Sequence, residues 1–350
     1  MKVTVKSFLN VRVGKPSVNA PCYQYLAPGT ELEVDGNLYP GDRVEGIDTW
    51  LKDEAGNYYW SGGVNNAPET KVAPPVSDQY WWLNDYHIPY IHSLGLTGKG
   101  IKVAVLDTGV CINHPVLSLN TNLMHDVTES LSGVNDIYGH GTHCIGIINA
   151  SKGKYGQLGI APDAIIFVCK ITKDSFGDSK ERLAKGLEWA INQEVDIISI
   201  SKGSFDDYGS GVTEQIEKGV SKGILFVCAA GNKKKGFPND HICFPARYRQ
   251  ILSVGAVDQN KEPIESSILS GETKIFAPGE NILSTYLNND AIQMSGSSQA
   301  TPFIAGICAL ILQRQREANP TCKAAIILNQ IQHYSDSFQH GLIVNPLKIF

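Results

Sequence analysis

The hydrophobic and polar positions of this chain follow two patterns, one over about the first 64 residues and another from about residue 80. The first segment has short runs of β-branched and aromatic residues, separated by turn signals such as Pro40-Gly41-Asp42. Five short strands in so few residues predict a small, SH3-like β-barrel over residues 1–64. The predicted strands are Val3–Lys6, Leu9–Val13, Glu31–Val34, Trp50–Lys52 and Tyr58–Trp60, the last two joined as a hairpin by a turn that contains Gly56.

A polar, proline-rich segment follows, and residues 65–79 are predicted to be an extended linker. From residue 80 onward, short apolar runs alternate with helical patterns. Ser179–Gln193 has apolar residues at helical spacing, with Asp178 and Glu181 placed like a capping pair. This alternation predicts an α/β domain over residues 80–350, with a mostly parallel sheet and helices on both faces. Its predicted strands include Lys102–Leu106, Ala164–Lys170, Asp196–Ile200 and Ile224–Ala229.

Composition narrows the class of protein without giving a function. Hydrophobic residues make up 42% of the 350 residues, which is enough for a large core. The formal net charge of −5 gives no reason to expect nucleic acid or a membrane surface as a partner. No apolar run approaches the roughly 20 residues that cross a bilayer. Because the first residues contain no continuous apolar stretch, we expect a cytoplasmic protein, or a secreted one whose leader has been removed.

The eight cysteines favour the first of these two locations. Cys144, Cys169, Cys228 and Cys308 lie within apolar runs, where a cysteine usually behaves as a small buried hydrophobic residue. The spacings match neither a metal site nor a small disulfide scaffold. We therefore expect reduced thiols, which are typical of the cytoplasm.

Two segments carry side chains suited to acid–base chemistry. The run VAVLDTG, residues 103–109, predicts an apolar strand that ends at Asp107, although a single aspartate after a strand is often only a turn residue. The run GHGTHCIG, residues 139–146, places His140 near the start of a predicted helix. His140 and His143 could instead bind zinc, but no further pair of ligands accompanies them.

Two later segments supply candidates for a nucleophile and for an oxyanion donor. The run VCAAGN, residues 227–232, ends a predicted buried strand at Asn232, whose amide is either a turn group or such a donor. The run MSGSSQATP, residues 294–302, leads into a helix predicted over Phe303–Arg316. Ser298 would lie at the helix N-terminus, which favours negative charge, although a serine there is often only an N-cap. Such groups gather at the carboxyl ends of the strands in an open α/β sheet.

Taken together and in this order, the four segments strongly resemble the signatures of subtilisin-like serine proteases, and the resemblance covers about residues 80–350. It implies a catalytic triad in the chain order Asp, His, Ser. Ser298 would attack the peptide carbonyl, His140 would transfer the proton, and Asp107 would orient the imidazole. Asn232 and the backbone N–H of Ser298 would form the oxyanion hole.

The resemblance also implies a cleft that binds a protein or peptide substrate as an added strand. Cys243 would lie near the floor of the pocket for the side chain on the acyl side of the scissile bond. Lys233, and Lys202 opposite, would favour an acidic side chain there, unless the lysine run is only a solvated loop. The predicted substrate-binding residues are Ser201, Lys202, Gly203, Ala230, Gly231, Lys233 and Cys243.

Three features depart from the family pattern. Ser297 and Gln299 replace the threonine and methionine that usually flank the nucleophile, and no inhibitory prodomain is recognisable. A calcium site of many family members is not matched, because residues 151–157 contain Lys152 and Lys154, which would repel the ion. We expect no cofactor and no metal at the site, and no calcium at this loop, while calcium elsewhere stays possible.

The N-terminal segment resembles bacterial SH3-type domains through LNVRVG, residues 9–14, and through residues 26–34 and 49–52. Such domains imply a peptide or cell-wall ligand and a role in targeting or regulation, but the domain could simply pack on its neighbour. We predict a serine endopeptidase that acts through an acyl-enzyme intermediate. The alternative is a catalytically silent peptide-binding protein that retains the subtilisin fold.

Overall fold

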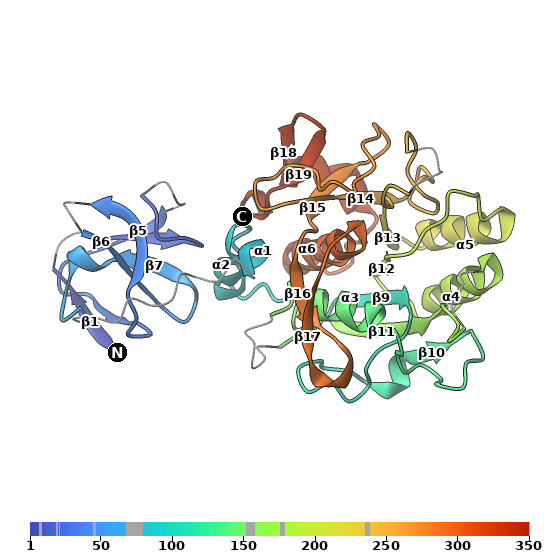
Figure 1. The fold of residues 1–350 in the computed structure, drawn as a ribbon, viewed down its shortest axis with the longest axis horizontal. Coiled ribbons are helices and arrows are strands. Elements are labelled where there is room, and N and C mark those ends of the chain that lie inside the picture. Colours follow the sequence, from blue (N-terminus) through green and yellow to red (C-terminus); the bar gives the residue numbers. More distant parts are fainter. Residues whose placement is uncertain are drawn as a thin grey trace. The chain divides into compact units, whose positions relative to one another are not determined.

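The computed structural model describes residues 1–6, 9–18, 20, 22–44, 47–67, 80–151, 158–175, 179–234 and 239–349. The chain divides into two compact units, Met1–Gly95 and Leu96–Phe350 (Figure 1). Most of the predicted linker, residues 68–79, lies outside the described residues. No helix in the described ranges is both long and apolar enough to cross a membrane.

The first unit contains two small antiparallel sheets in its described residues. The five-stranded sheet has the order β3-β2-β7-β6-β5, and the three-stranded sheet has the order β4-β1-β8. The two short helices α1 (Trp81–Asn84) and α2 (Ile88–Ser93) also belong to this unit. The strands are β1 Lys2–Val5, β2 Leu9–Val13, β3 Cys22–Leu26, β4 Glu31–Glu33, β5 Tyr39–Val44, β6 Ile47–Lys52, β7 Asn57–Trp60 and β8 Val64–Asn65.

The predicted hairpin is present as β6 and β7, in which Trp50 pairs with Trp60. Gly56 in its turn has φ +85°, a conformation that favours glycine. Strands β3, β5 and β8 were missed by the sequence pattern. Pro40 and Gly41, which signal a turn, lie inside β5, where the pairing with β6 shifts register. An edge strand accepts a proline because one side of its backbone needs no partner in the sheet.

The second unit is built on a nine-stranded sheet, as counted over the described residues, in the order β10-β11-β9-β12-β13-β14-β15-β19-β18. All neighbouring strands are parallel except β18 and β19. Strands β16 (Ile282–Thr285) and β17 (Ala291–Met294) form a separate hairpin. The sheet strands are β9 Lys102–Asp107, β10 Met124–Asp126, β11 Ile165–Lys170, β12 Ile197–Ile200, β13 Leu225–Ala229, β14 Leu252–Val257, β15 Ile275–Pro278, β18 Ser335–Phe338 and β19 Gly341–Val344.

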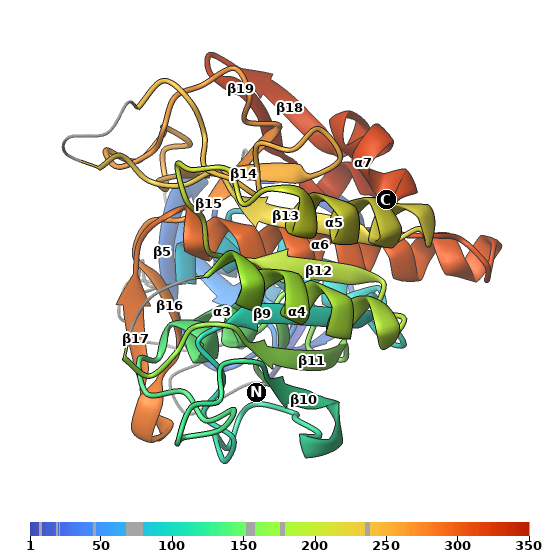
Figure 2. The ribbon, with the colours of Figure 1, turned by 90° about the vertical axis from the view of Figure 1, so that its right-hand side faces the viewer.

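Helices cover both faces of this sheet. Helices α3 (His140–Asn149) and α6 (Ser297–Ala318) lie on one face, and α4 (Lys180–Asn192) and α5 (Ser210–Ser221) lie on the other (Figure 1). Figure 2 shows α4 and α5 in front of the strands, and the short helix α7 (Ile326–Gln330) near the C-terminus. The central strands β9, β12, β13, β14 and β15 are buried on both faces, which explains their continuous apolar runs, whereas the edge strands β10 and β18 are only partly buried.

The α/β prediction is therefore confirmed, with differences at two helix starts. The N-cap of α4 is Ser179, whose hydroxyl accepts from Arg182 N, while Asp178 lies outside the described residues. Helix α6 begins at Ser297, six residues before the predicted start. Pro302 lies inside the helix because another donor replaces the N–H that it lacks, as described below.

Candidate active site

Strand β9 ends at Asp107, whose side chain is almost completely buried at 1% exposure. Asp107 Oδ1 accepts from the backbone N of Thr108 at 2.7 Å and lies 2.7 Å from Nδ1 of His140. Since a carboxylate only accepts, His140 Nδ1 carries a hydrogen, and in the neutral imidazole Nε2 is the ring nitrogen left as an acceptor. Gly109 has φ +104°, and a Cβ at this position would lie 2.3 Å from the carbonyl oxygen of Val134. Glycine therefore allows the chain to turn sharply after Asp107.

His140 is the first residue of α3, and the backbone before it is tightly constrained. A Cβ at Gly139, which has φ +85°, would lie 2.0 Å from the ring of Tyr286. Asp136 caps the helix, because its buried carboxylate accepts from Gly139 N and Thr142 N, each at 2.9 Å. The His140 side chain therefore extends from a helix start that the Asp136 carboxylate holds by hydrogen bonds.

Burial and charge oppose each other at this pair of residues. Burial disfavours the charged form of His140, but the carboxylate of Asp107 and the thiol of Cys144 outweigh it, so the pKa of His140 lies well above 6.5. Burial likewise acts to raise the pKa of Asp107, but His140 and Lys202 lower it below its usual value. The pKa of His143, by contrast, falls to about 4 because the ring is buried.

Ser298 lies in the first turn of α6 and is partly exposed. Its hydroxyl donates to the carbonyl of Ser201 at 3.1 Å. Its own carbonyl would accept from residue 302 in a regular helix, but Pro302 has no N–H. The hydroxyl of Ser201 donates to this carbonyl at 2.8 Å instead, and the Cys144 thiol lies 3.5 Å from it. These contacts join the start of α6 to the end of β12 and to α3.

Asn232 follows β13 and faces the start of the same helix. Its Oδ1 accepts from Ser297 N at 3.1 Å, which leaves Nδ2 as the donor of the amide. The neighbouring Gly231 has φ +96°, and its N donates to Ser297 Oγ at 3.2 Å. A Cβ at Gly231 would lie 2.4 Å from Cys243 Sγ. This close packing fixes the direction in which the Asn232 amide points.

A cavity of about 450 Å³ lies beside these groups. Of the predicted substrate-binding residues, Ser201, Lys202, Gly203, Gly231 and Cys243 line it, together with Asn232 and Ser298. Six further residues line it that were not predicted to bind substrate, although each adjoins a predicted segment: Ser204, Phe205, Asp206, Ala229, Lys234 and Ser297.

Two predicted substrate-binding residues lie outside this lining. Ala230 is buried, and its backbone N and O bond to Val254 and Cys243. Lys233 instead directs its ammonium to the carbonyl of Glu265 at 3.0 Å. The next residue, Lys234, lines the cavity in its place. Sequence spacing alone could not separate these two neighbouring lysines.

Among the described residues, Asp107, His140 and Cys144 form one group whose possible metal-binding atoms lie within 4.8 Å of one another. The side chains of Asp107 and His140 are already hydrogen-bonded to each other, so we derive no metal chemistry from the group. His143 Nε2 contacts the carbonyls of Ile282 and Ile292 at 3.0 and 3.1 Å, so the two histidines face different neighbours. We predict that no calcium binds at residues 151–157. Residues 152–157 of this loop lie outside the described part of the chain.

The four cysteines that were expected to be buried are buried, and all eight cysteines are free thiols in the structure. Burial raises the pKa of Cys169, Cys228 and Cys308 far above the usual thiol value. These residues therefore act as small apolar side chains of the core rather than as reactive groups.

Comparison with known proteins covers the region that contains the four segments. Residues 98–342 match the family model described as the subtilase family. The M-protease of Shouchella clausii is 36% identical over 265 residues, which cover 76% of this chain and 67% of that protein. Subtilisin Savinase of Lederbergia lenta is 35% identical over 73% of this chain and 91% of that protein. The major intracellular serine protease of Bacillus subtilis is 36% identical over 66% of this chain and 74% of that protein.

A solved structure agrees at the level of the fold. The crystal structure of MycP1 with its N-terminal propeptide removed superposes with a TM-score of 0.66 at 23% identity. The match covers 77% of this chain and 96% of that chain. With the family model spanning most of the second unit, the chain belongs to the subtilase family and is a subtilisin-like serine endopeptidase that acts on proteins or peptides.

Proposed function

We propose that Ser298 is the nucleophile, His140 the general base and acid, and Asp107 the residue that orients the imidazole. The observation that carries this proposal is the 2.7 Å contact between Asp107 Oδ1 and His140 Nδ1. It leaves Nε2 to accept the proton of the Ser298 hydroxyl. In the free enzyme this hydroxyl donates to Ser201 O, so it must rotate toward His140 when substrate binds.

The proposed reaction has two halves. Ser298 Oγ attacks the peptide carbonyl carbon while its proton moves to His140 Nε2, and the resulting oxyanion is bound by Asn232 Nδ2 and Ser298 N. The C–N bond then breaks as His140 gives the proton to the leaving amine. Water next attacks the acyl-enzyme ester and gives its proton to His140. The C–O bond to Ser298 then breaks, and the proton returns to its oxygen.

Labelling with a fluorophosphonate tests the nucleophile. We expect one label per chain, none in Ser298→Ala, and full labelling in Ser295→Ala, because Ser295 is an exposed serine three residues earlier. Peptide cleavage should follow the same order. Cleavage or labelling that survives in Ser298→Ala would end the assignment and would favour another nucleophile.

We further propose a preference for Asp or Glu on the acyl side of the scissile bond. Lys202 and Lys234 both line the cavity, whereas Asp206 is the one acidic side chain among its described lining residues. The charge of Lys234 also acts on the Cys243 thiol, where it opposes the pKa rise caused by burial. A lysine about 4 Å from a carboxylate gains roughly 1–4 kcal/mol before screening. Solvent and side-chain entropy leave no more than about 1 kcal/mol, a several-fold rate preference.

For the first unit we propose an SH3-like domain that targets or regulates the protease by binding a peptide or cell-wall peptide. A cavity of about 690 Å³, larger than the one beside Ser298, supports this. Trp50 and Trp60 line it, and so do Lys6 and Arg12, which suit a ligand with a carboxylate. Ile47 also lines it, is 40% exposed and offers apolar contact.

The binding test uses the whole chain with Ser298→Ala, so that a bound peptide is not cleaved. Tryptophan fluorescence should report binding of an acidic peptide, with weaker binding of its amide counterpart. Arg12→Gln should remove this difference, while Lys2→Gln, which alters an exposed lysine outside the cavity lining, should not. No binding of acidic or cell-wall peptides would leave the domain with a packing role only.

We also propose a cytoplasmic location and a calcium-free loop at residues 151–157. One relative is named an intracellular serine protease, and the eight free thiols fit a reducing compartment. Cell fractionation tests the location, and recovery of the protein in the culture medium would contradict it. A calcium ion found at residues 151–157 by anomalous X-ray scattering would contradict the second proposal.

A further inference from the structure

Lys170, the last residue of β11, has a side chain with no exposed surface although it carries a charge. Its ammonium donates to Ser132 Oγ at 2.6 Å, to the carbonyl of Asn135 at 2.9 Å and to Asp174 Oδ1 at 2.7 Å. An ammonium has three hydrogens, so each of them has a partner. A buried charge without partners costs several kcal/mol, and this cost holds the three acceptors at the end of β11.

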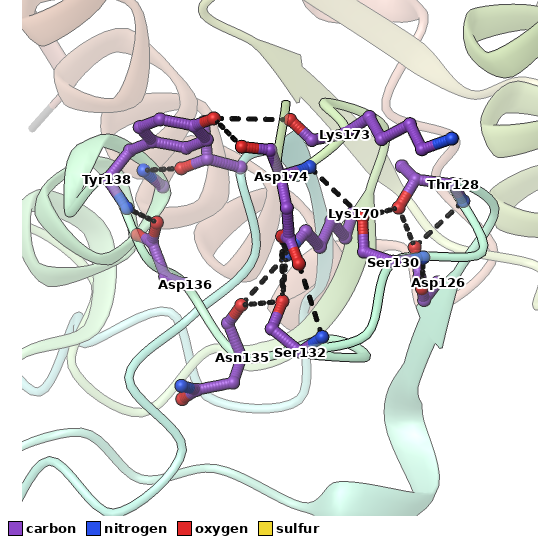
Figure 3. Close-up of polar contacts among 12 residues, drawn as sticks. Asp126, Thr128, Ser130, Ser132, Asn135, Asp136, Tyr138, Lys170, Lys173 and Asp174 are labelled. Atoms are coloured by element: carbon purple, nitrogen blue, oxygen red, sulfur yellow. Dashed lines mark hydrogen bonds and ion pairs between the residues drawn. The ribbon is translucent and has the colours of Figure 1, made fainter. Parts of the chain in front are cut away.

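Asp174 also links residues 130–135 to residues 170–174 (Figure 3). Its carboxylate accepts from Ser132 N at 3.2 Å and from Ser132 Oγ at 2.8 Å, and its own N donates to Ser130 Oγ at 3.1 Å. The hydrogen bond from Lys170 is the main reason that the pKa of Asp174 falls to about 2. Residues 130–135 and 170–174 are therefore linked by hydrogen bonds through both Lys170 and Asp174.

Residues 130–135 lead along the chain to His140. Asn135, held by the ammonium, precedes Asp136, whose carboxylate caps the helix that begins at His140. Tyr138 donates its hydroxyl to the carbonyl of Asp174 (Figure 3). Residues 135–140 are thus held at both ends, by Lys170 at Asn135 and by the Asp136 carboxylate at the start of the helix.

The same lysine is also anchored beside the partner of His140. Strands β11 and β9 are parallel neighbours, and Lys170 pairs in register with Asp107. We propose that Lys170 is a positioning residue, which holds residues 130–138 so that the His140 imidazole meets the Asp107 carboxylate. The proposal rests on the proposed roles of His140 and Asp107. It does not require Lys170 to touch the substrate.

Lys170→Met tests the proposal, with Lys173→Met as the matched control. Lys173 loses the same charge three residues away, but its side chain is exposed and its ammonium points away from the network (Figure 3). Active sites are counted by stoichiometric fluorophosphonate labelling, so that misfolded protein does not enter the rate. We expect kcat per labelled site to fall about tenfold in Lys170→Met, with KM within about twofold, because misplaced catalytic groups slow chemistry more than binding. Lys173→Met should match the unmodified enzyme.

The pH dependence gives a second readout, which a purely structural role would not move. Asp107 raises the pKa of His140, so a looser contact lowers that pKa and keeps the imidazole neutral to lower pH. The midpoint of the acid limb of kcat/KM should therefore move to lower pH in Lys170→Met. A change only in the number of sites that label, with kcat and the acid limb unchanged, would overturn the proposal.

Asp174→Asn decides the question if Lys170→Met does not fold. Its side chain is 26% exposed, so the change in charge is tolerated more easily, and the size of the side chain is kept. We expect the same two effects, each smaller, and their absence would overturn the proposal. Failure of the proposed triad is separate, because it would appear as missing Ser298 labelling in the unmodified enzyme.

Discussion

Ser201→Ala tests whether a side chain replaces the helix hydrogen bond that Pro302 removes. The Ser298 carbonyl accepts from Ser201 Oγ at 2.8 Å, and its other neighbour, the Cys144 thiol at 3.5 Å, is a weak donor. Ser201→Ala therefore leaves a partly buried carbonyl almost without a partner. We expect the free energy of unfolding to fall by about 1–2 kcal/mol, the usual cost of such a group.

Pro302→Ala makes this prediction specific, because alanine restores the N–H that a regular helix directs to the Ser298 carbonyl. When Pro302→Ala is already present, Ser201→Ala should cost only about 0.5 kcal/mol, since the carbonyl keeps a strong donor. The double-mutant cycle should therefore give a coupling of about 1 kcal/mol between two residues that are 101 positions apart in the chain.

The protein without either change, the two single variants and the double variant are all compared in a Ser298→Ala background. This background prevents self-cleavage and keeps the backbone carbonyl of residue 298. Unfolding in guanidinium chloride gives the free energies by linear extrapolation. If unfolding is irreversible, the unfolding rates at one denaturant concentration replace them. An equal cost of Ser201→Ala with and without Pro302→Ala would refute the reasoning, because the carbonyl would then not depend on Ser201.

Three further changes test the site. Asn232→Ala should lower kcat by about 10²–10³ with the fold intact by circular dichroism, since one oxyanion donor is lost; a loss below threefold would exclude that role. Asp107→Asn should lower kcat by about 10⁴ and move the acid limb of kcat/KM to lower pH, because the carboxylate raises the pKa of His140; an acid limb that moves to higher pH would contradict this sign. Lys234→Glu should abolish the preference for Glu over Gln in matched peptides at low salt, and Lys233→Glu should leave it largely intact; the opposite ranking would restore Lys233 as the specificity residue.

The order and spacing of local segments identified most of the peptidase unit from the sequence. Strands such as β9 and β13 appear as continuous apolar runs because helices bury both faces of the sheet. Asp107 and Asn232 could be recognised because each follows such a run. The local pattern gave a wrong helix boundary where a contact between distant residues replaces a helix hydrogen bond. The helix predicted from Phe303 begins at Ser297 instead, and Pro302 lies inside α6, where Ser201 supplies the missing donor.

Only the tertiary structure could separate Lys233 from Lys234, since adjacent residues leave a loop in different directions. It alone also singled out Lys170, which ends an apolar run that gives no sign of a function. A lysine is usually exposed, and its burial here depends on acceptors from a segment more than 30 residues earlier, Ser132 and Asn135. Hydrophobic periodicity reflects which face of an element is buried, so most elements of the second unit and their order could be predicted from the sequence. Contacts between distant side chains depend on how these elements pack against one another, and that decided which polar groups meet.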